Sequence, residues 1–321
     1  MNKQPIIIVA GEPNSVFLEI FFKSIKSNKF KHPLIIIASR KLLISQMNKL
    51  GYIFKINSIN KNLKNISELN NKNINLINVD YKFNACFQNI TIKSKSYIEK
   101  CFKIALEILK KNKFTKFING PISKRHFLKG HHYGVTEYLS NKTGVNNKVA
   151  MLIFHKKLSV SPLTTHIALK DVHKNISQKK IFSHVILITQ FYIEKFNKIP
   201  RIAITGLNPH CESNFNNSEE DLIIKPAIKD LIKLKYKVKG PYAADTIFTK
   251  DQFKKFDVII GMYHDQVLSP AKTLFGFDAI NITLGLPFIR ISPDHGPNIS
   301  MLGKNTSNPK SLIQALKFLD K

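Results

Sequence analysis

Three histidines each follow a short aliphatic run that resembles a buried β-strand. His166 follows residues 159–163, His210 follows residues 201–205, and His264 follows residues 257–260. Ligands of open α/β sheets bind beyond the carboxyl ends of the strands, so three such loops can share one crevice. Three neutral imidazoles bind a divalent metal and leave positions open for a substrate. A single loop histidine is usually solvated, and this chain has eleven, so the repetition carries the prediction of a metal site.

Two acidic residues are candidates for proton transfer or for orienting a metal ligand. Asp265 directly follows His264, and Asp245 lies in the turn Ala243-Ala244-Asp245-Thr246. A carboxylate can perform either role, although each residue alone is also typical of a helix cap or a surface acid. The sequence does not decide between the two acids.

A second group of residues indicates an anion site. Lys272 lies eight residues after His264, and Asn281 and Arg290 bracket residues 282–289. Arginine offers a bidentate fork and lysine a point charge to a phosphate or carboxylate. Lysine is abundant in this chain, so Lys272 alone indicates little, whereas arginine is scarce and Arg290 is more informative.

The chain lacks the two common nucleotide motifs. No Gly-x-Gly-x-x-Gly follows a strand-like run, and there is no Walker loop. A conventional Rossmann or P-loop site is therefore not predicted, and any dinucleotide must bind otherwise.

Strand-like and helix-like stretches alternate along the chain. The expected strands are short, aliphatic and bounded by Gly, Pro or Asn: residues 6–10, 34–38, 114–118, 158–163, 202–205, 258–262 and 279–284. Amphipathic helices are expected at residues 97–111, 179–196 and 218–234. This alternation predicts an α/β fold with a largely parallel sheet. Residues 55–80, rich in Asn and Lys, are expected to form a variable surface excursion.

Composition narrows the class of protein. A chain of 321 residues with 43% apolar residues can bury a core. Its aliphatic runs are far shorter than the ~20 residues that cross a bilayer, and residues 6–10 are too short for a signal-peptide core. Three cysteines without metal or redox spacing fit a reducing compartment. We therefore expect a cytoplasmic protein with no membrane partner.

The formal net charge is +29, which ordinarily suggests nucleic-acid binding. The lysines are scattered along the whole chain and accompany an excess of Asn and Ile, as a coding bias would produce. We therefore expect no nucleic-acid partner. The positive field would still attract anionic substrates such as phosphates.

The motifs resemble those of one family, the 4-hydroxythreonine-4-phosphate dehydrogenases of vitamin B6 (pyridoxal phosphate) biosynthesis. The likeness covers nearly the whole chain in order and is densest after residue 200. The matching stretches are Gly11-Glu12-Pro13, Gly120-Pro121-Ile122-Ser123-Lys124, Thr136-Glu137, Thr164-Thr165-His166, Gly206-Leu207-Asn208-Pro209-His210, Ala244-Asp245-Thr246, Met262-Tyr263-His264-Asp265-Gln266, and residues 281–296 with Ser292-Pro293-Asp294-His295-Gly296.

The resemblance implies a two-domain fold like that of the isocitrate and isopropylmalate dehydrogenases. Residues 1–125 with 300–321 would form one domain, and residues 126–299 a second that carries the metal ligands. The protein would be a homodimer with its active site in the cleft between the domains. NAD or NADP would bind without a Rossmann motif.

The resemblance also implies roles for individual residues. His166, His210 and His264 would bind one divalent ion (Zn, Mg or Co), with His264 contributed by the partner subunit. The substrate-binding positions fall on Thr136, Lys272, Asn281 and Arg290. Asp245, Asp265 and Lys272 are the candidate catalytic residues.

The implied reaction is oxidation of 4-phosphooxy-L-threonine by NAD, followed by decarboxylation to 3-amino-2-oxopropyl phosphate. A divalent metal would lower the pKa of the alcohol and then polarise the new ketone. One alternative keeps the fold and metal but acts on another phosphorylated or carboxylated hydroxy acid. A non-enzymatic alternative is a basic nucleic-acid-binding protein that retains an old fold.

The chain departs from the family pattern at four places. Val135 replaces a substrate-contacting histidine, for which His131 or His132 could substitute. The glycine-rich stretches after Gly-Glu-Pro and after Asn-Pro-His are replaced, and Pro297 stands where a threonine is usual. These changes are expected to reflect drift, with a shifted substrate preference or weakened activity as the alternatives.

Overall fold

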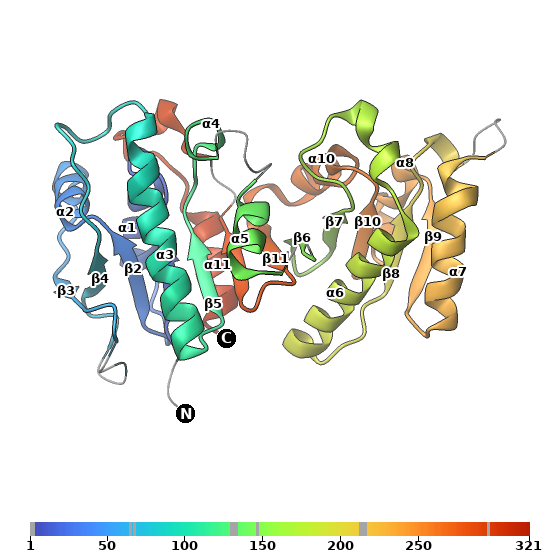
Figure 1. Ribbon diagram of the computed structural model, residues 1–321, viewed down its shortest axis with the longest axis horizontal. Coiled ribbons are helices and arrows are strands. Elements are labelled where there is room, and N and C mark those ends of the chain that lie inside the picture. Colours follow the sequence, from blue (N-terminus) through green and yellow to red (C-terminus); the bar gives the residue numbers. More distant parts are fainter. Residues whose placement is uncertain are drawn as a thin grey trace. The chain divides into compact units, whose positions relative to one another are not determined.

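The computed structural model describes residues 4–63, 66, 69–128, 134–145, 148–211, 217–293 and 296–321. The chain divides into two compact units (Figure 1). Unit 1 comprises Met1–Tyr138 and Pro287–Lys321, and unit 2 comprises Leu139–Leu286. These joins lie later than the expected domain boundary at residue 125 and earlier than the one at residue 299. Thr136 and Arg290 consequently belong to unit 1.

Unit 1 contains a parallel sheet in the order β3-β4-β2-β1-β5-β12. The strands are β1 (Ile6–Val9), β2 (Leu34–Ala38), β3 (Ile56–Ser58), β4 (Ile74–Asn78), β5 (Lys116–Asn119) and β12 (Ile289–Ser292). All four residues of β1 and all five of β2 are buried, as in sheets covered on both faces.

The helices of unit 1 cover both faces of this sheet. They are α1 (Phe17–Ser27), α2 (Arg40–Lys49), α3 (Lys95–Asn112), α4 (Lys124–Phe127) and α11 (Lys310–Leu319). α1 contacts α2 and α11, whereas α3 packs on β1 and β2 and contacts α4. The crossover from β1 to β2 and the crossover from β4 to β5 run in opposite directions, so right-handed connections put α1 and α3 on opposite faces.

Unit 2 contains strands in the order β11-β6-β7-β10-β8-β9. They are β6 (Ala150–Phe154), β7 (Ser159–Pro162), β8 (Ile202–Thr205), β9 (Val238–Tyr242), β10 (Val258–Gly261) and β11 (Ile280–Leu284). β7, β10, β8 and β9 pair in parallel, while β6 is antiparallel to β7 and to β11.

Several helices in the described ranges lie wholly in the second unit. They are α6 (Gln178–Phe196), α7 (Lys225–Lys233), α8 (Ala244–Ile247), α9 (Lys250–Phe253) and α10 (His264–Phe275), while α5 (Val135–Thr143) crosses the join. Val267 and Ala271 of α10 pack into a core cluster with Val160 and Ile259. Short helices occur at Ile92–Ser94, Leu169–Asp171, His173–Asn175, Pro209–Cys211, Glu220–Ile224 (a π-helix), Gly276–Asp278 and Ile299–Met301.

The prediction of an α/β fold with a largely parallel sheet is confirmed, and each expected strand and helix overlaps an observed element. The prediction for residues 55–80 is wrong, because that segment contains β3 and β4. β4 lies between β3 and β2 and buries Ile74, Leu76 and Ile77. Its polar Asn75 is also buried, and the Nδ2 atom donates to the carbonyls of Leu34 and Asn70. The side-chain amide of Asn75 is thus fully hydrogen-bonded through its Nδ2 inside the sheet, and the polar composition of the segment concealed a strand.

Within the described ranges, no helix is both long and apolar enough to cross a membrane.

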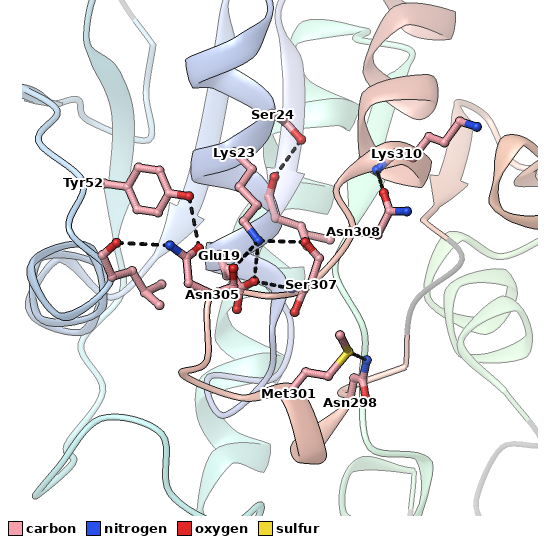
Figure 2. A network of polar contacts seen from close by, with 12 residues as sticks. Glu19, Lys23, Ser24, Tyr52, Asn298, Met301, Asn305, Ser307, Asn308 and Lys310 are labelled. Carbon is pink, nitrogen blue, oxygen red and sulfur yellow. Dashed lines mark hydrogen bonds and ion pairs between the residues drawn. The ribbon is translucent and has the colours of Figure 1, made fainter.

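A buried polar cluster, here called the Glu19 clasp, ties the segment before α11 to α1 (Figure 2). Lys23 Nζ donates to Glu19 Oε1 (2.8 Å) and to the carbonyls of Asn305 (2.9 Å) and Ser307 (2.8 Å). The backbone N–H of Ser307 donates to the same Glu19 oxygen at 2.6 Å. Glu19 is only 2% exposed, so these partners offset the cost of burying its carboxylate.

We predict that Lys23→Met lowers the free energy of unfolding by about 2 kcal/mol, because it leaves the buried Glu19 carboxylate without its cation. The matched control is Lys225→Met. Lys225 also pairs four residues back, with Asp221 at 2.6 Å, but both side chains are more than half exposed. The control should cost less than about 1 kcal/mol. Urea unfolding of both variants measures the difference, and equal losses would contradict the role of burial.

Candidate active site

The loops that follow β1 and β5 meet backbone to backbone at the carboxyl edge of the unit 1 sheet. A Cβ atom on Gly11 would lie 2.5 Å from the Pro121 carbonyl oxygen, and one on Gly120 would lie 2.2 Å from that of Ala10. The N–H of Glu12 donates to the same Pro121 oxygen at 2.9 Å. Only glycine fits at these two positions. Because the chain leaves β1 and β5 toward opposite faces of the sheet, this is the place where a crevice opens in α/β folds.

Arg290 lies on β12 beside this crevice and is 3% exposed. Its Nε donates to Asn119 Oδ1 at 2.7 Å, and its Nη1 donates to Thr136 Oγ1 at 3.3 Å. Burial lowers the pKa of Arg290 to about 10, and the neighbouring Glu137 carboxylate partly opposes that shift. The guanidinium therefore stays charged near neutral pH. An oriented, desolvated guanidinium can bind a phosphate or a carboxylate.

The structure brings Thr136 and Arg290 together as neighbours, and it adds Asn119, which the sequence reasoning missed. Asn119 is the last residue of β5, and its Nδ2 donates to the Gly120 carbonyl at 2.9 Å. The signal available in the sequence was an asparagine directly after the expected strand at residues 114–118. This residue orients the Arg290 side chain.

Two of the three predicted histidines lie side by side in unit 2. The segments after β7 and β10 remain paired beyond the strands, with Leu163 N donating to the Gly261 carbonyl (2.7 Å) and Thr164 Oγ1 to that of Met262 (2.7 Å). The rings of His166 and His264 consequently have centroids 6.0 Å apart. Two imidazoles on one zinc ion have ring centres roughly 5–6 Å apart, because each metal–nitrogen bond is ~2 Å.

Asp265 holds the ring of His264. His264 Nδ1 lies 2.6 Å from Asp265 Oδ1, and His264 is the first residue of α10. A carboxylate on one ring nitrogen fixes the orientation of the imidazole and leaves the other nitrogen for a ligand. The structure thus assigns Asp265 a contact that suits an orienting residue.

Gln266 joins the loop of His264 to the loop that carries His210. Its Oε1 accepts from Thr205 Oγ1 (2.8 Å) and from Met262 N (2.7 Å), and its Nε2 donates to the Gly206 carbonyl (2.8 Å). His210 itself is exposed and has a φ of 57°. Gln266 belongs to one of the matching stretches of the sequence. Its role in connecting the two loops depends on hydrogen bonds to Thr205 and Gly206, which lie 61 and 60 residues earlier in the chain.

Glu220 is a second residue that the sequence reasoning missed. It is completely buried, and its Oε1 accepts from the backbone N–H groups of Leu207 (2.7 Å) and Asn208 (2.9 Å). Asn208 Nδ2 donates to Oε2 at 2.9 Å. Burial alone would raise the pKa of Glu220, but the hydrogen bonds from Asn208 and Leu207 outweigh it and hold the pKa below its usual value. The carboxylate therefore shapes the turn that leads to His210.

The remaining predicted residues of unit 2 lie at separate places. Asp245 is an exposed residue of α8 and lies near Cys211. Burial raises the pKa of the Cys211 thiol, and the negative charges of Glu220 and Asp245 raise it further. Lys272 lies on α10 roughly 12 Å along the helix axis from His264. Partial burial lowers the pKa of Lys272. Asn281 lies on β11, and its Oδ1 is buried without a hydrogen-bond partner among the described residues.

The structure brings some predicted residues together and leaves others untested. In the described ranges, no group of three or more His, Cys, Asp or Glu is placed to hold a metal ion. A three-histidine site and the contribution of His264 by a partner subunit remain predictions, although one chain already places His264 beside His166. His131, His132, Asp294, His295 and residues 212–215 lie outside the described residues.

The fold and these contacts define an α/β protein with a buried, hydrogen-bonded arginine in unit 1 and two neighbouring histidines in unit 2, one of which is in contact with a carboxylate. The chain belongs to the pyridoxal phosphate biosynthetic protein PdxA family, whose model matches residues 29–319. The resemblance identified from the sequence is thereby confirmed.

Individual relatives support the same assignment. A 4-hydroxythreonine-4-phosphate dehydrogenase of Sulfurihydrogenibium sp. (strain YO3AOP1) is 38% identical over 98% of this chain and 96% of its own length. A putative D-threonate 4-phosphate dehydrogenase of Oceanobacillus iheyensis is 31% identical over 98% and 97%. The solved structure of a putative 4-hydroxythreonine-4-phosphate dehydrogenase from Salmonella typhimurium has a TM-score of 0.85 at 28% identity and covers 99% of this chain and 98% of that one.

We predict that Glu220→Gln makes the free energy of unfolding depend less on pH below about pH 5. A carboxylate whose folded pKa is lowered adds stability above its unfolded pKa, and that stability is lost as the pH falls through the folded pKa. The wild type should therefore lose stability below about pH 4.5, the usual value for Glu. The variant should be less stable at pH 7 and should change less across this range.

Urea unfolding at pH 7 and at several values below pH 5 measures the two slopes. Glu194→Gln is the control, because Glu194 is an exposed carboxylate of α6 in the same unit. It should keep the wild-type slope. An unchanged slope in Glu220→Gln would show that its hydrogen bonds do not stabilise the charged form.

Proposed function

We propose that this protein is a divalent-metal-dependent and NAD- or NADP-dependent dehydrogenase of pyridoxal 5'-phosphate biosynthesis. It oxidises the secondary alcohol of 4-phosphooxy-L-threonine and releases carbon dioxide to form 3-amino-2-oxopropyl phosphate. The observation that carries the proposal is the buried Arg290, held by Asn119 and Thr136 at the carboxyl edge of the sheet in a member of the PdxA family.

The substrate has two anionic ends, a phosphate and a carboxylate. Arg290 offers fixed N–H groups to one of them, and Thr136 offers a hydroxyl beside it. Lys272 and Asn281 of unit 2 are the proposed contacts to the rest of the substrate. The buried Oδ1 of Asn281 supports this assignment, because a buried acceptor without a partner is costly and a substrate donor would satisfy it.

We assign the metal to His166, His210 and His264. The donors fit in part: two imidazoles lie at the separation that a shared ion requires, and Asp265 orients one of them. Zinc, cobalt or magnesium are the candidate ions. A divalent ion bound there would lower the pKa of the alcohol and polarise the ketone formed by oxidation.

The chain's own residues perform the remaining tasks. A bound NAD or NADP would supply the hydride acceptor, and Asp245 or Asp265 is the proposed acceptor of the hydroxyl proton. The lowered pKa of Lys272 makes its ammonium a better proton donor to the carbon that loses carbon dioxide. The protein is proposed to act as a cytoplasmic homodimer with the active site near the subunit interface.

A second candidate is the oxidation of another phosphorylated hydroxy acid by the same machinery. Val135, next to Thr136 at the start of α5, replaces the histidine expected from the family pattern, and valine cannot donate to an anion. One relative is named a putative D-threonate 4-phosphate dehydrogenase. That substrate shares the phosphate but lacks the amino group.

We predict that the purified protein forms NADH from NAD and 4-phosphooxy-L-threonine, that a chelator abolishes this activity, and that zinc, cobalt or magnesium restores it. Absorbance at the NADH band measures the rate, and detection of carbon dioxide tests the second step. No reduced cofactor under any of these conditions, with NAD or NADP, would overturn the proposed function.

Substrate analogues distinguish the two candidates. Removal of the phosphate should cost several kcal/mol in kcat/KM, because the substrate would lose its charged hydrogen bonds to a site built for an anion. A higher kcat/KM with D-threonate 4-phosphate than with 4-phosphooxy-L-threonine would favour the second candidate.

We predict that Asp265→Asn weakens metal binding by about 10- to 100-fold, because the His264 ring loses the carboxylate that orients it. Titration with cobalt or zinc, monitored by calorimetry, measures the affinity without any turnover. Asp251→Asn is the control, since Asp251 is an acid in the first turn of α9. Equal affinities in the two variants would remove Asp265 from the metal site.

A further inference from the structure

A cavity of about 660 Å³ lies at the amino edge of the unit 1 sheet. Leu34 and Ile74, the first residues of β2 and β4, line it together with the last turn of α1. The crevice beside Arg290, in contrast, lies at the carboxyl ends of β1 and β5. The cavity is therefore separate from the candidate substrate site of this unit, and its volume is in the range of small-molecule sites.

Apolar side chains form much of the lining. Phe21, Leu34 and Ile74 are each at most 5% exposed and contribute the buried part. Phe54 is half-buried, and its ring is stacked on that of Tyr52 with centroids 6.1 Å apart, which fixes its orientation. Aromatic rings held in this way offer flat surfaces on which another ring can pack.

Asn71 fixes the backbone around the cavity. Its Nδ2 donates to the carbonyls of Phe30 (3.0 Å) and His32 (2.8 Å). Its Oδ1 accepts from the N–H of Leu34 at 2.8 Å. One side chain thus ties the segment before β4 to the segment between α1 and β2. A wall that is held in place before a ligand arrives lowers the entropic cost of binding.

The charge of the lining favours an anion. Lys26, Lys29 and Lys72 contribute to it, and no described residue that lines the cavity is acidic. None of these lysines forms an ion pair with a residue in the described part of the chain. Lys26 Nζ lies 5.5 Å from the centre of the Tyr52 ring, so its ammonium is held beside the aromatic stack.

The end of α1 partly opposes this charge. A helix C-terminus carries roughly half a negative charge, and the last turn of α1 lines the cavity. Three ammonium groups exceed that partial charge several-fold. The balance therefore remains positive, beside an apolar and aromatic wall.

We infer that this cavity is a second ligand site, which binds a small aromatic ring that carries a phosphate. The ring packs against Phe21 and Phe54, and the phosphate lies near Lys26 and Lys72. Pyridoxal phosphate, for whose biosynthesis the family is named, belongs to this chemical class. The choice of ligand rests on the lining and on the family, and it does not depend on the proposed reaction.

The test is calorimetric titration of the full chain with pyridoxine 5'-phosphate at low ionic strength, where charged contacts are least screened. This probe carries an alcohol instead of an aldehyde and so forms no imine with lysines. The wild type should bind it, and the double variant Lys26→Met, Lys72→Met should bind it at least ~5-fold more weakly, because two charge contacts are lost. The matched control is Lys41→Met, Lys49→Met, which removes two exposed lysines of α2 outside the cavity and should keep the wild-type affinity.

Inorganic phosphate and pyridoxine test the two halves of the ligand. Each should bind at least ~10-fold more weakly than pyridoxine 5'-phosphate, since one lacks the apolar contacts and the other lacks the charge. Equally tight binding of phosphate would show a simple anion site, and equally tight binding of pyridoxine would show that the lysines have no role. Either result would overturn the inference, as would no binding by the wild type or equal losses in the two double variants.

The rate of NADH formation separates this cavity from the active site. The double variant Lys26→Met, Lys72→Met should keep the wild-type kcat/KM for 4-phosphooxy-L-threonine, and a loss of activity would contradict a separate site. A protein that binds the probe through Lys26 and Lys72 but forms no NADH would retain this inference and overturn the proposed function.

Discussion

Parallel pairing of strands that are buried on both faces is the constraint on which the rest of this structure depends. In β1, β2, β8 and β10 every residue is buried, so these strands can carry almost no polar chemistry along their length. Polar side chains are therefore displaced to the loops at the carboxyl ends. Asn119, His166 and His264 all lie at or just beyond such ends.

The loops at these ends are held by buried polar side chains whose hydrogen-bonding groups are largely paired. Glu220 accepts from the backbone before His210, Gln266 connects the loops after β8 and β10, and Asn119 positions Arg290. A buried carboxylate or guanidinium is unfavourable unless its partners are fixed. The same pairing that offsets the cost of burial also fixes the geometry of the candidate site.

The two units carry different functional groups. Unit 1 offers the buried guanidinium of Arg290 at the carboxyl edge of its sheet. Unit 2 offers the imidazoles of His166 and His264 together with Asp265. The scattered positive charge of the chain would raise the rate of encounter with small anions.

The sequence alone determined the elements whose signal is local. Residues 34–38 and 202–205 form strands with those bounds, because short, mainly aliphatic runs bounded by turn residues suit strands that are buried on both faces. The three strand-like runs that are each followed by a histidine were also visible in the sequence.

Tertiary structure decided what local composition conceals. β4 is buried although it carries asparagines, because Asn75 donates to carbonyl groups on other segments. Likewise, Arg290 is held by Asn119, 171 residues away. The cost of burying a polar group depends on partners that only the folded chain supplies, so no local pattern could reveal these contacts.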